Sequence, residues 1–244
     1  MHIVKINSLE STNKYCEALD LSTVGDFTCY WALEQTAGIG QRGNHWHSEA
    51  GQNLTFSLVL KPDFLAAGCQ FRLTQSLSLA MVDFLSSFTF HEAALIKWPN
   101  DIYIGQKKIC GTLVSARLNA GSIASAICGV GLNVNETVFP DWVPNPTSIA
   151  LLAGREHDLE PLLHNLLLHI ERRYGELRRG FNPQDEYLAR LMNLGRAAKY
   201  QYRGEEIVAE ITGVDEFGRL QLTAADGRRL CCAMKEISYA SYLA

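Results

Sequence analysis

The sequence predicts an α+β protein in which a body built on a mixed sheet is followed by a small β-barrel. Up to about residue 193, apolar strand patterns alternate with helical patterns, whereas after Gly195 short strands and turns follow one another. The turns "RGEE", "DEFGR" and "ADGRR" have the close spacing of a small all-β module. We therefore expect two domains, residues 1–193 and residues 194–244.

The first half of the body has the order strand, helix, strand, strand and helix. After a short opening strand, Ser11 or Thr12 provides a good N-cap for a helix. Apolar strands are expected over residues 27–35 and 53–60, on either side of a glycine-rich loop. Residues 70–88 have the apolar spacing of a helix that is buried on more than one face.

The second half of the body begins with a succession of short strands over residues 95–136. Gly105 and Gly121 supply the turns between these strands. Pro146 marks the start of a helix, and an amphipathic helix is expected from Leu159. A short helix over residues 184–192 completes the body.

The composition describes an ordinary soluble globular protein. The chain has 244 residues, 47% of them hydrophobic, and a formal net charge of −4, so no basic excess points to nucleic acid. We find no secretory leader and no apolar stretch long enough to span a bilayer. The seven scattered cysteines include no C-x-x-C pair, which indicates reduced thiols in a cytoplasmic protein.

The stretch "TAGIGQRGNHW" over residues 36–46 contains glycines in the G-x-G-x-x-G spacing of dinucleotide-binding loops. Such a loop binds a dinucleotide only where a helix opens directly after it. Here an alternating strand pattern follows instead, which argues against NAD. Two interpretations stay open: a hairpin loop that needs glycines for positive φ, and a mobile loop that is ordered by an anionic ligand.

Four clusters place polar, charged or small residues within otherwise apolar strands. They are Ser11, Thr12 and Asn13; Gln35, Gln41, Arg42 and Trp46 around the glycine loop; Lys97, Asn100, Asp101, Lys107, Lys108 and Gly111; and Gly129, Gly131, Asn133 and Asn135. Taken singly, they can be a helix cap, a "WPND" turn, a solvated lysine pair and a β-bulge. Together they provide amides, cations and oxygen ligands for Mg²⁺, the groups needed to bind a nucleoside triphosphate and to stabilise attack at phosphorus.

Five motifs occur in the order and approximate spacing of the biotin protein ligases. They are "STN", "EQTAGIGQRGNHW", "KWPNDIYIGQKKICGTLVSA", "GVGLNVN" and "NPTSI". The chain resembles this family over nearly its whole length, and the resemblance implies a catalytic body of the biotin/lipoate ligase type with an SH3-like C-terminal barrel. It also implies a two-step reaction: biotin and Mg-ATP give biotinyl-5′-AMP, and biotin then passes to a lysine of a biotin carboxyl carrier protein or domain.

The resemblance assigns roles to the residues that match the motifs. Lys108 is the expected catalytic residue, which contacts the biotin carboxylate and the α-phosphate. The residues expected to bind biotin and its adenylate are Ser11, Thr12, Asn13, Gln35, Gly38, Ile39, Gly40, Gln41, Arg42, Gly43 and Gly111. Those expected at the nucleotide are Trp46 and Asn133 at the adenine, Asn100 and Asp101 at Mg²⁺ and the triphosphate, and Lys97 as a second cation.

One departure concerns the glycine loop, because Ile39 and Gln41 stand where the family often has arginines. Two alternatives and two further expectations accompany the ligase interpretation. A lipoate or octanoate ligase lacks support because the R-R-x-S-G-G-G-A stretch is missing, and a non-catalytic biotin or adenylate sensor is the other alternative. No DNA-binding helix-turn-helix precedes Met1, so we expect the monofunctional form, which does not bind DNA. Strand edges leave a homodimer open.

Overall fold

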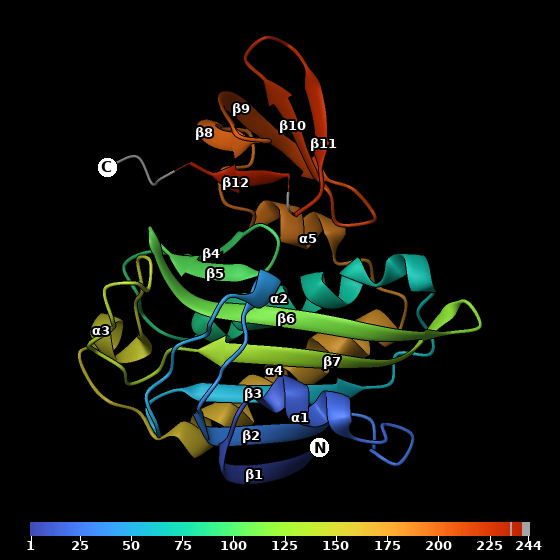
Figure 1. The fold of residues 1–244 in the computed structure, drawn as a ribbon, viewed down its shortest axis with the longest axis vertical. Helices are drawn as coiled ribbons and strands as arrows, with labels where there is room; N and C mark the ends of the chain where they lie inside the picture. Colours follow the sequence, from blue (N-terminus) through green and yellow to red (C-terminus); the bar gives the residue numbers. More distant parts are fainter. Residues whose placement is uncertain (235, 241–244) are drawn as a thin grey trace.

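The computed structural model describes residues 1–234 and 236–240 as two sheets with flanking helices (Figure 1). The larger sheet has the order β1-β2-β3-β7-β6-β5-β4. Its strands are β1 His2–Leu9, β2 Thr28–Gln35, β3 Leu54–Leu60, β4 Ala94–Lys97, β5 Asp101–Ile104, β6 Lys107–Asn119 and β7 Ser122–Leu132. The helices are α1 Thr12–Ala18, α2 Phe71–Leu85, α3 Ile149–Ala153, α4 Leu159–Arg178 and α5 Gln184–Ala189.

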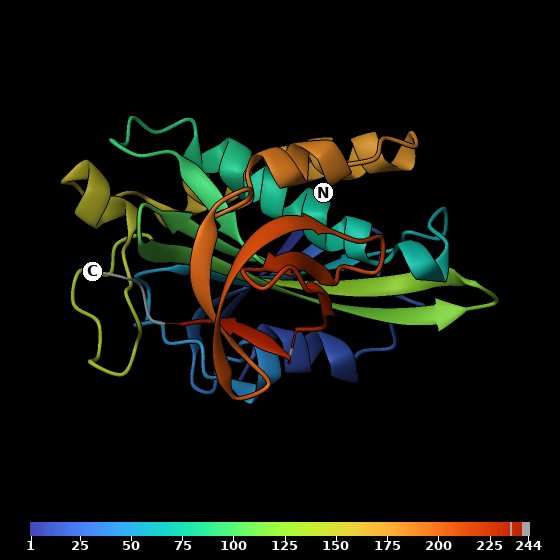
Figure 2. The ribbon, with the colours of Figure 1, turned by 90° about the horizontal axis from the view of Figure 1, so that it is seen from above.

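The larger sheet is mixed, as the sequence predicts. β1 and β2 run parallel, and the other neighbouring strands pair antiparallel. The parallel pair follows from chain geometry, because α1 separates the two strands and carries the chain back across the sheet. Figure 2 shows α1 on one face of the sheet and α2 with α4 on the other. This arrangement leaves the helix start after β1 beside the middle strands.

Helix α2 is buried between the sheet and α4, which explains its apolar residues on more than one face. Leu79, Met81 and Phe84 are each at most 1% exposed. Such side chains stabilise the fold by roughly 1.5–3 kcal/mol each when fully buried. The expected helix over residues 70–88 is therefore confirmed, with bounds shorter by a few residues at its C-terminus.

The helices of the body begin for different local reasons. Ser148, rather than Pro146, caps α3, since its hydroxyl accepts a hydrogen bond from the Leu151 amide. Gly154 ends that helix in the left-handed region at φ 69°. Ser11 holds the N-cap position of α1, but its side chain makes no capping hydrogen bond. The capping interpretation of the Ser11 side chain is therefore wrong.

The C-terminal sheet has the order β11-β10-β9-β8-β12. Its strands are β8 Ala197–Tyr202, β9 Glu205–Val214, β10 Leu220–Ala224, β11 Arg229–Cys232 and β12 Ile237–Tyr239. All four neighbouring pairs are antiparallel, and no ladder joins the two outer strands within the described residues. The all-β character of this module is confirmed. The domain boundary between residues 193 and 194 stays a prediction.

Direct hydrogen bonds connect the C-terminal sheet to the body. The indole Nε1 of Trp98, in the turn after β4, donates to the Gly218 carbonyl over 3.0 Å. Gln184, the first residue of α5, donates to the Val214 carbonyl over 2.6 Å. These contacts place the C-terminal sheet over the β4–β5 end of the larger sheet (Figure 1).

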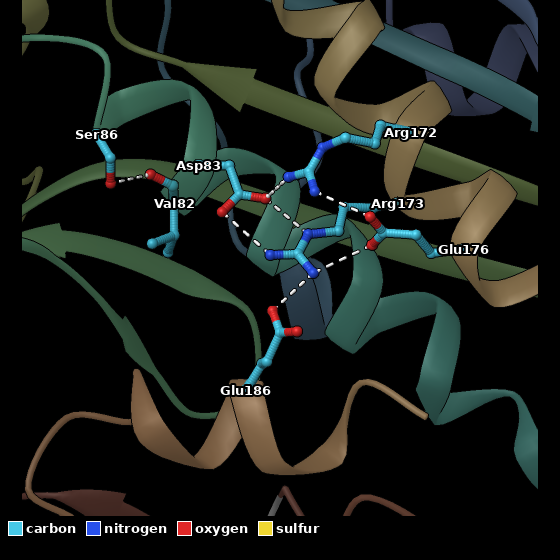
Figure 3. Close-up of polar contacts among 7 residues, drawn as sticks. All are labelled: Val82, Asp83, Ser86, Arg172, Arg173, Glu176 and Glu186. Carbon is cyan, nitrogen blue, oxygen red and sulfur yellow. Dashed lines mark hydrogen bonds and ion pairs between the residues drawn. The ribbon is translucent and has the colours of Figure 1, made fainter. Parts of the chain in front are cut away.

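A buried ion-pair cluster fixes α5, the helix that leads into the C-terminal sheet (Figure 3). Arg173 of α4, with a side chain 9% exposed, pairs with Asp83 of α2 over 2.6 Å and with Glu186 of α5 over 2.7 Å. Burial alone would lower the pKa of Arg173, but hydrogen bonds to Asp83 and Glu186 raise it, so the guanidinium stays charged. Three helices are thereby held by one cation.

The cysteines are free thiols, as the sequence predicts, and five of the seven are buried. Burial raises the pKa of the Cys16 thiol to about 12, which keeps it protonated and unreactive. None of the described helices combines the length and the apolar character that crossing a membrane requires.

Candidate active site

Two adjacent cavities open beside the glycine loop, and the first of them lies between the larger sheet and the C-terminal sheet. The first has a volume of about 280 Å³. Fourteen residues singled out from the sequence line it: Ser11, Thr12, Asn13, Gln35, Ile39, Gly40, Gln41, Trp46, Lys97, Asp101, Lys108, Gly111, Gly129 and Gly131. The clusters from distant parts of the sequence are therefore brought together in one place.

A network of buried polar side chains forms one end of the first cavity. The carbonyl Oε1 of Gln35 accepts from the Thr12 amide over 2.7 Å and from the Thr12 hydroxyl over 3.1 Å. Ser57 of β3 donates within the same network, where its Oγ lies 2.8 Å from Thr12 Oγ1 and 2.5 Å from Asn13 Oδ1. Both of these hydrogen bonds end on the oxygen of Gln35, so its amide nitrogen Nε2 is the group that can donate to a ligand. The network thus holds both donors and acceptors in fixed positions.

The sequence analysis did not single out Ser57. It is fully buried in β3, a strand whose other residues are mostly apolar. A polar residue within such a strand needs a hydrogen-bond partner. A serine in an apolar strand could therefore have indicated a buried polar contact. Its partners belong to α1, however, and only the tertiary structure identifies them.

The strand glycines of β7 provide space for side chains of the cavity. A Cβ at Gly129 would collide with the Asn13 amide group, and a Cβ at Gly131 would collide with the Trp46 indole. Across the sheet, Gly111 pairs with Gly131, and a Cβ there would lie 3.1 Å from the same indole. The ladder is regular at both β7 glycines, because its only register shift lies further along, so the bulge interpretation is wrong.

The glycine loop is folded as a short hairpin beside the first cavity. The Gly40 amide donates to the Asn44 carbonyl over 2.7 Å, and the Trp46 amide donates to the Gly38 carbonyl over 2.9 Å. Gly43 has a positive φ of 79°, and a Cβ at Gly38 would touch the Trp46 carbonyl. The loop is therefore a hairpin, but of its three glycines only Gly43 needs a positive φ, and ordering by an anionic ligand stays a prediction. The side chain of Arg42 lies outside the described part of the structure.

The lysine pair at residues 107 and 108 divides between solvent and cavity. Lys107 is exposed, whereas Lys108 lines both cavities and pairs with Asp101, its Nζ 2.8 Å from Oδ1. The Lys108 ammonium also lies 5.5 Å from the centroid of the Trp46 ring. Alternation along β6 explains the division, since successive side chains point to opposite faces. The interpretation of the two lysines as a solvated surface pair therefore holds for Lys107 and not for Lys108.

Lys97 lies where the body meets the C-terminal sheet. Its ammonium is 5.1 Å from the Tyr103 ring centroid and 4.8 Å from that of Tyr239 in β12. Burial lowers the pKa of Lys97, although the neighbouring Asp101 acts to raise it. The C-terminal sheet therefore contributes an aromatic side chain beside a cation of the first cavity.

Of the two residues of the "WPND" turn that were expected at Mg²⁺, one faces the cavity and the other is buried away from it. Asp101 lines the first cavity, whereas Asn100 is 2% exposed and donates its amide to the Thr112 carbonyl. Asn100 lines neither of these two cavities. Within the described residues, no group of three His, Cys, Asp or Glu side chains is close enough to hold a metal. The protein therefore offers a single carboxylate here.

The second cavity, of about 420 Å³, adjoins the first and shares Trp46 and Lys108 with it. Its lining is aromatic and proline-rich: Asn44, His45, Trp46, His47, Lys108, Asn133, Phe139, Trp142, Val143, Pro144 and Pro146. Asn133 is buried and donates to the Thr147 carbonyl over 2.9 Å, which leaves its Oδ1 as an acceptor. Phe139 and Trp142 were not predicted from the sequence, although aromatic residues within the loop "VFPDWVPNP" were a usable signal.

Comparison with known proteins identifies the family. The profile of the biotin/lipoate A/B protein ligase family matches residues 6–133, more than half of the chain. The chain belongs to this family. A biotin–[acetyl-CoA-carboxylase] ligase of Paracoccus denitrificans is 32% identical over 231 residues, with 91% of this chain and 94% of the relative covered. The bifunctional ligase/repressor BirA of Bacillus subtilis is 29% identical, with 93% of this chain and 70% of the relative covered.

The fold agrees with that of solved members of the family. The biotin protein ligase from Aquifex aeolicus, solved in complex with biotin and ATP, superposes with a TM-score of 0.79 at 23% identity, and 97% of each chain is covered. The expected architecture of a mixed-sheet body followed by a small β module is therefore confirmed.

Proposed function

We propose that this chain is an ATP-dependent biotin protein ligase that makes biotinyl-5′-AMP and transfers biotin to a lysine of a carrier domain. The observation that carries the proposal is the pair of joined cavities with Lys108 and Trp46 at their junction. The Paracoccus relative, which is named as a biotin–[acetyl-CoA-carboxylase] ligase, supports the same activity. An acyl-adenylate consists of an acyl part and a nucleotide part, so its two halves match two adjoining cavities.

We place the biotin in the first cavity and the adenine in the second. The donor of Gln35 and the hydroxyls of Ser11 and Thr12 suit the polar ureido ring, because a buried amide needs partners for both its oxygen and its nitrogens. The aromatic walls Trp46 and Trp142 suit a flat heteroaromatic ring, which stacks favourably on indole. In this assignment Asn133 offers its free oxygen to an amino group of the base.

Lys108 lies where the two reacting anions must meet. In the first step a biotin carboxylate oxygen attacks the α-phosphorus, a new P–O bond forms, and pyrophosphate leaves. Two unit charges 4 Å apart repel by about 4 kcal/mol at an effective dielectric constant near 20, so a cation at the junction offsets a large part of the barrier. In the second step the lysine amine of the carrier attacks the acyl carbon, and AMP leaves as the acyl–phosphate bond breaks.

Asp101 is the residue that would hold Mg²⁺. A single carboxylate is enough, since Mg²⁺ usually takes one or two carboxylates and completes its shell with phosphates and waters. The ion, when bound, would neutralise charge on the β- and γ-phosphates. Asp101 also steadies the Lys108 ammonium at 2.8 Å, so the carboxylate orients the cation whether or not the ion is present.

Two elements that border the first cavity shield the intermediate, which water would hydrolyse. The glycine loop contributes Ile39 and Gln41 to the first cavity, and the C-terminal sheet contributes Leu220 and Ile237. Excluding water also strengthens every electrostatic contact inside the site. We propose that the C-terminal sheet takes part in this shielding rather than in the chemistry.

The acceptor that we propose is a biotin carboxyl carrier domain, in line with the name of the Paracoccus relative. Free thiols fit a reducing compartment such as the cytoplasm. β1 is an outer strand of the larger sheet, and its edge is where we propose that a second copy or the carrier pairs.

The test is ATP–pyrophosphate exchange by the purified chain with Mg²⁺, with biotin, lipoate and octanoate supplied in turn. We expect exchange with biotin alone. Exchange driven by lipoate or octanoate would instead identify the chain as a lipoate or octanoate ligase. Biotin binding without any exchange would favour a sensor.

A further inference from the structure

Glu136 is a buried carboxylate that the proposed chemistry leaves without a role. It follows β7 at the start of the loop that carries Trp142, and its side chain is 2% exposed. Burying a charge is costly unless other groups compensate it. Three groups do so here: Asn53 donates its amide, the Glu49 backbone N–H donates over 3.3 Å, and His47 Nε2 lies 2.6 Å from Oε1.

The carboxylate connects two loops that line the second cavity. His47, Glu49 and Asn53 belong to the segment between the glycine hairpin and β3, whereas Glu136 belongs to the loop after β7. Asn53 strengthens the connection, because its Oδ1 accepts from the Val134 amide over 2.8 Å. The contact with His47 is a close ion-pair approach rather than an aligned hydrogen bond.

His47 extends the connection to an aromatic wall of the second cavity. Its ring meets the Trp142 ring edge-on, with centroids 5.7 Å apart and an interplanar angle of 85°. Trp142 is 60% exposed, so most of its ring surface is not packed against the protein. His47 also follows Trp46 directly in the chain. One buried carboxylate is thus linked through His47 to both indoles.

We infer that His47 and Glu136 form a positioning pair for the nucleotide half of the site: Glu136 holds His47, and His47 holds the Trp142 ring against the second cavity. The inference rests on the proposed function, which puts adenine in that cavity. Among the described residues, the three polar partners of Glu136 (His47, Glu49 and Asn53) do not line the first cavity, so the pair governs affinity for ATP and leaves biotin binding unaffected.

The experiment compares ATP and biotin binding by calorimetry in His47→Ala, Glu136→Ala and the milder Glu136→Gln, each with Mg²⁺. The matched control is Asp83→Ala, which breaks a comparable carboxylate cluster between α2 and α4. We expect the two alanine variants to weaken ATP binding roughly 2- to 12-fold, the range for losing an aromatic pair. Glu136→Gln keeps its hydrogen bonds and should weaken it less. Biotin affinity should stay within about twofold, as should both affinities in the control.

A double-mutant cycle that combines Glu136→Ala with Trp142→Ala tests whether Glu136 affects ATP binding through the Trp142 ring. If Glu136 acts through Trp142, then Glu136→Ala adds little to the loss that Trp142→Ala already causes. Three results would overturn the inference: additive losses in the cycle, equal weakening of ATP and biotin, or a similar loss in Asp83→Ala. A wild-type chain that binds ATP but shows no biotin-dependent exchange would refute the ligase proposal while the positioning pair could still be judged on ATP affinity.

Discussion

Replacing Gly131 with alanine perturbs the junction of the two cavities with a single methyl group. Gly131 lies within β7, where β3 pairs on one side and β6 on the other, so its backbone has little freedom to move. The added Cβ would collide with the Trp46 indole, where Cε2 is the nearest atom and Cζ2 and Nε1 each lie 2.6 Å away. The indole must therefore give way, since the sheet does not.

The displacement sets the expected size of the effect. Ordinary contact begins at 3.4 Å, which is 0.8 Å beyond the two atoms at 2.6 Å, and because Cε2 lies nearer still the ring has to retreat by more than 0.8 Å. Overpacking of this kind costs about 1–3 kcal/mol. A ring that retreats also loses its place beside the Lys108 ammonium, which lies 5.5 Å from its centroid. We expect ATP affinity to fall by roughly 5- to 100-fold, which is that free energy expressed as an equilibrium ratio.

The assay is calorimetric titration of Gly131→Ala with ATP, accompanied by pyrophosphate exchange in the presence of biotin. Gly68→Ala is the control, because a Cβ there meets nothing within 4 Å and its φ is not in the left-handed region. The control should bind ATP like the wild type.

Unchanged ATP affinity in Gly131→Ala would refute this reasoning. It would mean that the indole does not occupy the space above β7 in solution, and that Gly131 has no function beyond its backbone. A loss of the same size in Gly68→Ala would point to general damage instead.

Four further predictions follow from individual residues. Lys108→Ala should slow adenylation by at least about 100-fold, as for loss of a transition-state donor; a smaller loss in exchange rate would make Lys108 a surface residue. Gln41→Gly should release more adenylate, measured as biotin label on a bystander protein, and unchanged labelling would count against a retaining role. Burial acts to raise the pKa of Asp215, but hydrogen bonds from Arg219 lower it below 3.8. The stability that Asp215 adds is therefore complete above pH 3.8 and lost as pH falls through the lowered pKa, so denaturation of wild type and Asp215→Asn should converge in acid. Cys231 is exposed, and alkylation of the native chain followed by peptide mass spectrometry should find it labelled ahead of the buried thiols.

Much of the fold could be predicted because its signals are local. The apolar period of α2 and the strand patterns of β2 and β3 each lie within one short window of sequence. Boundaries were less accurate where a tertiary contact decides them. Ser148 rather than Pro146 begins α3, and Ser11 faces the first cavity instead of capping α1.

The site was only partly predictable for the same reason. Lys108 and Asp101 were found because charged residues within apolar strands are conspicuous. Trp142 and Ser57 were missed, since an exposed tryptophan in a loop and a serine in a strand are common features. Asn100 could not be told apart from Asp101 by sequence, because only the turn geometry decides which of the two side chains is buried.

The sequence by itself determined the order of the elements, the α+β class and the types of residue that chemistry needs, because periodicity and turn residues act over a few positions. The tertiary structure alone decided which residues meet. Gly111 faces Gly131 through strand register, and Glu136 reaches His47 across 89 positions through the packing of two loops. Register and loop packing are set by the burial of the whole sheet, so no local stretch of sequence contains them.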